Sequence, residues 1–131
     1  MRFTERELTL ALEGAAKTML AASDKDVRKG RRTPDEAWQA LTRYQRFQLL
    51  DGLGDQLLGV LVGLPDVEVA IGTRPTFTDE QVTAAVRERA GDLGGLRGKV
   101  LLKARVTLVQ VALSHIPPRA DPDALIVPDH L

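Results

Sequence analysis

LRGKVLLKARVTLVQVALSHI, residues Leu96 to Ile116, is the stretch that decides the fold. Its polar side chains recur at steps of four, four, three and four residues, on one narrow line along a helix; they are Lys99, Lys103, Thr107, Gln110 and Ser114. Arg105 lies clearly off that line. So thin a polar stripe is typical of a central helix, because neighbouring helices must cover its other sides.

We therefore predict a buried helix over 96–116 at the centre of the molecule. The side chains expected in the core are Leu101, Ala104, Leu108 and Val111, and Lys103 should reach solvent or an acid. A strand is a weaker alternative, because strict alternation fails and the stretch exceeds the usual length of about 5–6 residues. A membrane span needs about 20 apolar residues, and charged side chains interrupt this run.

The whole chain has the composition of one soluble globular domain. Its 131 residues are 44% hydrophobic and 27% charged, and the formal net charge is zero. The length and the hydrophobic content indicate a single domain with one ordinary core. The zero net charge gives no reason to expect binding to nucleic acid through overall charge. Cysteine is absent, which excludes disulfides and thiolate metal sites. The start, MRFTEREL, has no apolar signal core, so we expect a cytoplasmic protein; the residue usage indicates a GC-rich bacterial genome.

Two segments, 3–13 and 77–87, begin with the same helix-start signal. Each has Phe, then Thr, then an acid, with Glu or Gln three residues after the Thr, so that Thr4 and Thr78 each open a capping box. We predict one helix from Thr4 to about Ser23 and another from Thr78. A duplicated helical hairpin and two independent uses of the same capping chemistry both explain the similarity.

The region 33–64 predicts a long helix after a charged loop over 24–32. Thr33 is an N-cap, the next residue is a proline at the first helical position, and Glu36 completes a capping box. The inward face is predicted to comprise Ala37, Leu41, Tyr44, Phe47, Leu50, Leu53, Leu57, Leu61 and Leu64. Because this stripe passes two glycines, we expect one helix bent near 51–54, or two in line, ending before Pro65.

The segment that follows changes character. Val67, Val69 and Ile71 alternate with less apolar residues and are closed by Gly72. This pattern is typical of either an extended connector or a strand edge that is available for pairing with a partner.

The carboxy-terminal segment, 117–131, is predicted to be an extended, proline-rich arm that follows a helical domain over 1–116. It carries one apolar triplet, Leu125, Ile126 and Val127, among prolines and acids. Flexible ends are usually polar, so we expect the triplet to dock on a partner or a neighbouring subunit. Packing on its own domain is the alternative.

Charge is unevenly distributed along the chain. From Lys17 to Arg46 there are eight basic and four acidic residues, and from Asp51 to Gly95 there are three basic and eight acidic ones. Such asymmetry favours steering of a partner or head-to-tail self-association, and a mixed solvated surface is the alternative. The basic residues expected to contact an acidic partner or nucleic acid are Arg28, Lys29, Arg31, Arg32 and Arg43.

The sequence offers no catalytic or metal-binding constellation. Gly52 and Gly54 lack the third glycine of a dinucleotide fingerprint. The two histidines, His115 and His130, follow no known metal-ligand spacing, and His115 suits the carboxyl end of a helix. We therefore predict no enzyme, no cofactor and no metal site.

Together these patterns predict an all-α, single-domain bundle of four to five helices around 96–116. The expected function is protein–protein interaction: a small adaptor or assembly component that binds another protein or a second copy through its helical surface and arm. Nucleic-acid binding through the basic 25–46 region, with Trp38 and Tyr44 nearby, is the alternative. No membrane partner and no small-molecule substrate are expected.

Overall fold

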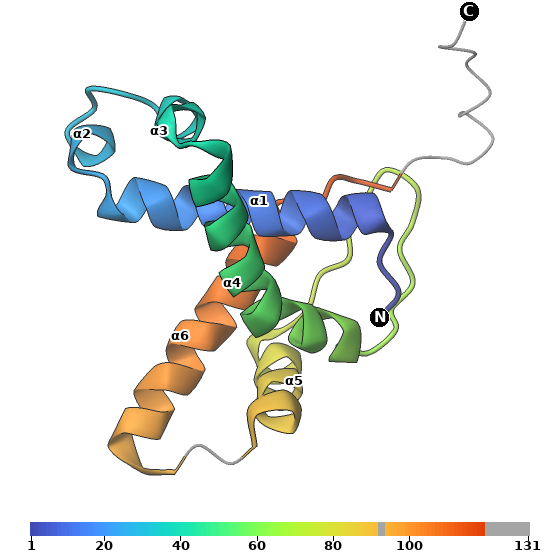
Figure 1. Cartoon of the computed structure of the whole chain (residues 1–131). Helices are drawn as coiled ribbons and strands as arrows, with labels where there is room; N and C mark the ends of the chain where they lie inside the picture. The colour runs from blue at the N-terminus through green and yellow to red at the C-terminus, as the bar shows by residue number, and fades with distance from the viewer. Residues whose placement is uncertain (92–93, 120–131) are drawn as a thin grey trace, which may run out of the picture.

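The chain folds as a bundle of α-helices (Figure 1). The computed structural model describes residues 1–91 and 94–119, and within these ranges it contains no strand. The helices of these ranges are α1 (Glu5–Ser23), α2 (Lys25–Arg28), α3 (Pro34–Ala40), α4 (Arg43–Gly63), α5 (Asp79–Ala90) and α6 (Gly95–Ser114). The all-α prediction is confirmed, but the described residues form six helices instead of the four to five predicted, because α2 lies in the predicted loop and α3 is separate from α4.

The core lies where the four long helices meet. Both α1 and α5 pack against α4 and against α6, while α2 and α3 pack on or near α1. Figure 1 shows α1 lying across the bundle, with α5 and α6 extending to the same side of α1. The largest fully buried side chains are Leu57, Val60, Leu61, Leu64, Val82, Val86, Val109 and Ile116. None of the helices in the described part of the chain is long and apolar enough to cross a membrane.

Capping boxes start four of the helices. The boxes predicted at Thr4, Thr33 and Thr78 are all formed, with the hydroxyl and the partner side chain each accepting a backbone N–H. A further box, Thr42 with Gln45, was not predicted. It explains why the expected helix over 33–64 is divided: Leu41 has extended backbone, and α4 begins afresh after Thr42.

This division makes the predicted inward face wrong at two aromatic residues. The side chains of Tyr44 and Phe47 are 67% and 62% exposed, because the break at Leu41 resets the rotation of the helix that carries them. Leu53, Leu57, Leu61 and Leu64 are buried as predicted, and Leu50 is half-buried. Helix α4 runs unbroken through both of its central glycines. The predicted loop over 24–32 also contains α2, which Asp24 caps through its carboxylate.

The prediction for the central helix is right over only half of its length. The residues of α6 that are buried are Gly98, Val106, Val109, Ala112 and Leu113. Leu101 and Ala104 are exposed and Leu108 and Val111 are half-buried, so the predicted core face is wrong at the first two and only partly covered at the others. Lys103 reaches solvent, as predicted.

The crossing of α1 over α6 explains this difference. A Cβ atom placed on Gly14 would lie 2.0 Å from Cγ of His115, the residue that caps the end of α6. The glycine therefore allows α1 to contact the carboxyl end of α6 closely. Thr18 Oγ1 lies 3.4 Å from Nε2 of the same imidazole. Because this close contact lies at the carboxyl end, the amino-terminal half of α6 is covered incompletely, and Val100 and Leu101 stay mostly exposed.

Arg119 fixes the chain where it leaves the bundle. Its backbone N–H donates to Thr73 O (2.7 Å) and its carbonyl accepts from Gly72 N (2.8 Å). Its Nε donates to Oε2 of Glu7 (3.0 Å), a carboxylate that is buried, and Nη2 donates to Arg2 O (3.0 Å). The segment after α6 is thus tied to both α1 and the connector between α4 and α5.

That connector is irregular, without strand. Val67 and Val69 are half-buried and Ile71 is exposed. Pairing of this edge with a partner stays a prediction.

Candidate interaction groove

The amino-terminal half of α6 presents large apolar side chains to solvent. Leu96 is 80% exposed, Val100 is 62% exposed and Leu101 is 53% exposed. Single exposed aliphatic residues are ordinary on protein surfaces, but a contiguous run marks an interaction site. These three residues lie within two turns of one helix, so they form such a run.

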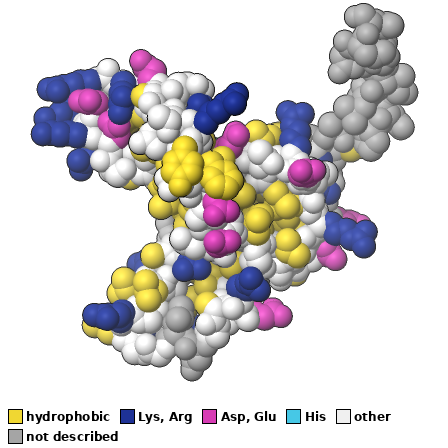
Figure 2. Space-filling view, viewed as in Figure 1, with side chains coloured by type: hydrophobic (Ala, Val, Ile, Leu, Met, Phe, Trp, Pro, Cys, Tyr) yellow, Lys and Arg dark blue, Asp and Glu magenta, His cyan; other side chains and the backbone are white. Residues whose placement is uncertain are grey.

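This surface continues into a groove between α6 and the last turns of α1. The groove has a volume of about 520 Å³ and is lined by Thr18, Met19, Ala22, Val100, Lys103, Ala104, Thr107, Leu108 and Val111. Figure 2 shows the molecule hollowed between the end that carries α2 and α3 and the end that carries the start of α6. Among the lining residues that the structure describes, Lys103 is the one with a charged side chain.

Spacing along α6 shows what kind of surface the groove is. Leu101, Ala104, Leu108 and Val111 follow one another at steps of three, four and three residues. That spacing forms the seam between two packed helices, and grooves of this kind bind a helix or an extended apolar segment. The spacing therefore has the pattern of a packing face, but in the described chain no segment covers it fully.

Helix α6, which forms one wall of the groove, has only basic residues among its charged side chains. Arg97, Lys99, Lys103 and Arg105 lie on α6, and this helix contains no Asp or Glu. A ligand for the groove should therefore combine an apolar centre with flanking carboxylates, since complementary charge speeds association and selects the partner.

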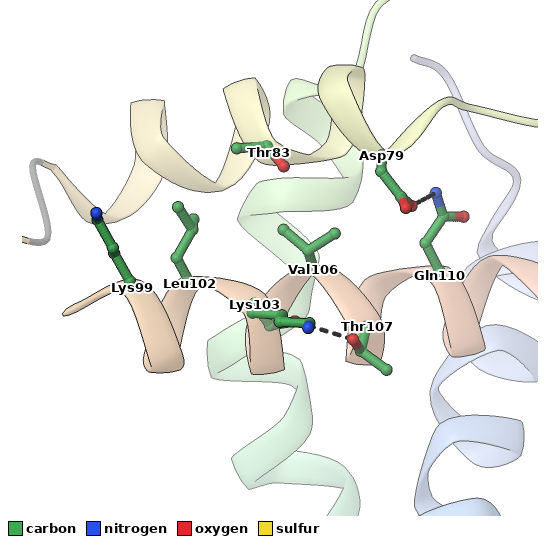
Figure 3. Close-up of a pocket in the computed structure, with 8 residues that line it drawn as sticks. All are labelled: Asp79, Thr83, Lys99, Leu102, Lys103, Val106, Thr107 and Gln110. Carbon is green, nitrogen blue, oxygen red and sulfur yellow. Dashed lines mark hydrogen bonds between the residues drawn. The ribbon is translucent and has the colours of Figure 1, made fainter. Parts of the chain in front are cut away.

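A second cavity, of about 460 Å³, lies between α5 and α6 (Figure 3). Leu102 and Val106 supply its apolar part, and Lys103 lines both cavities. Gln110 Nε2 donates to Asp79 Oδ1 (3.0 Å) and to Phe77 O (2.9 Å). These hydrogen bonds join α6 to the start of α5, so Gln110 and Asp79 have a structural role at this end of the cavity.

A third exposed apolar feature lies on α4. Tyr44 and Phe47, one turn apart, are followed along the same face by Asp51 and Asp55 and then by exposed Leu58. Sequence reasoning missed it, because the capping box at Thr42 was not recognised.

The predicted basic patch is partly neutralised within the chain. Arg31 pairs with Asp26 (Nη1 to Oδ1, 3.6 Å), and Arg32 forms an ion pair with Asp24. The hydrogen bond from Arg32, together with backbone N–H donors, holds the pKa of Asp24 below its usual value. Arg28, Lys29 and Arg43 are exposed.

Trp38, expected near this patch, is a residue of α3 whose side chain is buried, so it is not available for stacking on a base. Figure 2 shows acidic side chains interleaved with the basic ones around α2. The structure therefore leaves a smaller free basic surface than the sequence indicated.

The apolar triplet Leu125, Ile126 and Val127 lies outside the described residues, as does His130. Within the described ranges no group of three His, Asp or Glu residues is placed to hold a metal ion. Comparisons of the chain with protein-family models, with curated proteins and with solved structures found no match.

Proposed function

We propose that the protein is a non-enzymatic protein–protein interaction module, and that its groove between α1 and α6 binds an apolar, acid-flanked segment of a partner protein. The observation that carries the proposal is the incompletely covered helix-packing seam Leu101, Ala104, Leu108 and Val111 on α6, of which the last three line the groove. Such a seam gains free energy only when another apolar surface excludes water from it.

The dimensions of the groove suit a short segment. Val100 and Val111 are eleven residues apart on α6, which is about 16 Å at the rise of an α-helix. That length accommodates about three turns of a partner helix or about five residues of extended chain. Each aliphatic side chain that a partner buries there contributes about 1.5–3 kcal/mol before the costs of association.

Selection from a displayed peptide library against the full chain tests the proposal. We expect the enriched peptides to place aliphatic residues at steps of three and four, or in a short run, with Asp or Glu on either side. The variant Ala104→Asp introduces a carboxylate into the groove and should weaken the binding of these peptides at least about tenfold, through desolvation of the new charge.

The matched control is Ala84→Asp, the same change at an exposed alanine of α5 that does not line the groove. It should leave the affinity unchanged. Peptides that bind equally well to both variants, or a selection that enriches no acid-flanked apolar peptide, would contradict the proposed function.

A second candidate function is nucleic-acid binding, favoured by exposed Arg28 and Lys29 at the end of α2 and by exposed Arg43, which precedes exposed Tyr44 in α4. Phosphate contacts release counterions, so the logarithm of the affinity for duplex DNA should fall with the logarithm of salt concentration by about 0.9 per contact. Salt-independent binding, or none at low salt, would remove this candidate.

A further inference from the structure

We infer that the groove between α1 and α6 is occupied in the free protein by the carboxy-terminal segment of the same chain, residues 120–131, with the triplet Leu125, Ile126 and Val127 on its apolar floor. The inference rests on the proposed function, since it names a regulator of the same groove. The partner's segment and this segment would then compete for one site.

Charge complementarity is the first argument. From Gly95 to Arg119 the chain has five Lys and Arg residues and no acid. From residue 120 to residue 131 it has three acids, Asp121, Asp123 and Asp129, and no Lys or Arg. The apolar triplet lies between these acids, so the segment has the chemistry that the groove requires of a ligand.

Reach is the second argument. Val111, at the near end of the groove, is four helical residues from His115, about 6 Å. The next four residues lead to Arg119 and span at most about 14 Å, so Arg119 lies within about 20 Å of Val111. Leu125 is six residues beyond Arg119 and can extend about 20 Å from it. The triplet can therefore reach Val111 and Leu108 without leaving its own molecule.

The anchoring of Arg119 favours the same chain over a neighbouring copy. Its bonds to Gly72, Thr73 and Glu7 hold the origin of the segment against its own bundle. A short tether from a fixed origin gives an effective concentration in the millimolar range, far above that of a second copy in dilute solution.

The consequence is a groove that is partly closed to partners. A ligand that binds only the open form has its apparent affinity reduced by the fraction of molecules that are open. Replacing the triplet with serines should raise that fraction and strengthen the binding of a selected peptide about 2- to 10-fold.

The absence of cysteine makes a direct test possible. The variant Ala124→Cys carries a single thiol beside the triplet, which can be labelled with a nitroxide in the full chain. Paramagnetic broadening of the backbone amides of Ala104 and Leu108 is expected, with little effect at Ala84 on α5. The same label in a chain that also carries Leu125→Ser, Ile126→Ser and Val127→Ser should lose this broadening.

Mixing labelled protein with an excess of isotope-enriched, unlabelled protein separates the same chain from a second copy. Broadening at the groove in the enriched, unlabelled molecules would overturn the inference, because the segment would then come from a neighbour. Absence of groove broadening in every sample would also overturn it. If peptides still bind the groove in an Ala104-dependent manner with equal affinity for the triple-serine variant, the proposed function stands and this inference fails.

Discussion

The two halves of α6 have similar apolar residues and opposite surroundings. In the carboxyl half Val106, Val109 and Leu113 are buried against α1 and α5, while in the amino half Leu96, Val100 and Leu101 face solvent. Burial would stabilise the valine and leucine side chains of both halves, but the described chain buries them only in the carboxyl half. An apolar helix face thus shows that cover is needed and does not show which molecule supplies it.

The place where cover stops is set by the packing of α1. This helix contacts α6 closely at Gly14, against His115, and its last turns then form the opposite wall of the groove through Thr18, Met19 and Ala22. The open half of α6 is therefore a consequence of how the two helices cross. Substitutions in each half of α6, and at its contact with α1, can test this difference.

The largest expected effect separates a buried leucine from an exposed one on the same helix. Leu113→Ala should lower the free energy of unfolding by about 2–5 kcal/mol, because a cavity remains in the core. Leu101→Ala should change it by less than about 0.5 kcal/mol, as for other surface substitutions. Chemical denaturation followed by circular dichroism measures both, and equal losses would contradict the contrast between the halves.

The next effect concerns the bond that holds the chain after α6. Arg119→Ala leaves the buried carboxylate of Glu7 without its cationic partner and should cost about 3 kcal/mol. Arg97→Ala, at an exposed arginine of the open half, is the control and should cost less than about 0.5 kcal/mol. A neutral result for Arg119→Ala in thermal unfolding would show that this ion pair does not fix the segment.

A smaller effect is expected where α1 crosses α6. Gly14→Ala places a methyl group against His115 and should destabilise the fold by about 1–3 kcal/mol, despite the better helix propensity of alanine. Gly52→Ala has open space around its new methyl group and should stabilise α4 by about 0.5–1 kcal/mol. If both changes stabilise the protein in denaturant titrations, the close contact of α1 with α6 is wrong.

The smallest effect concerns the end of α1 that forms the groove wall. The backbone N–H of Asp24 bonds to Leu20 O at the end of α1, its carboxylate caps α2, and Arg32 lowers the pKa of that carboxylate. A depressed pKa means that the carboxylate stabilises the fold above its unfolded pKa of about 4, and that this stabilisation is lost as pH falls through the lower folded value. Arg32→Ala should move the Asp24 pKa upward in a carboxyl NMR titration; an unchanged pKa would show that the ion pair does not form.

The helical class and most helix starts could be predicted from the sequence because capping boxes act locally. Thr4, Thr33 and Thr78 each bond residues only three positions away, so their pattern alone identifies the structure. The capping box of Thr42 and Gln45 has the same local pattern, so the break before α4 could also have been predicted. The continuous leucine stripe on either side favoured a single helix instead.

The groove could not be predicted because it depends on packing between distant segments. The pattern of Leu101, Ala104 and Leu108 identifies a packing face, and nothing within α6 indicates where along this helix α1 packs. Likewise, the pairing of Arg119 with Glu7 joins residues at opposite ends of the described chain.

The most direct test of the central claim is the affinity of a selected peptide for the variant Val100→Asp. Val100 lines the groove and is mostly exposed, so its replacement should leave the melting temperature within about 3 °C of the unmodified protein. We predict that peptide affinity falls at least about tenfold, because the new carboxylate meets the peptide's apolar centre and its acids. An unchanged affinity, or loss of cooperative unfolding, would contradict the assignment of this half of α6 as a docking face.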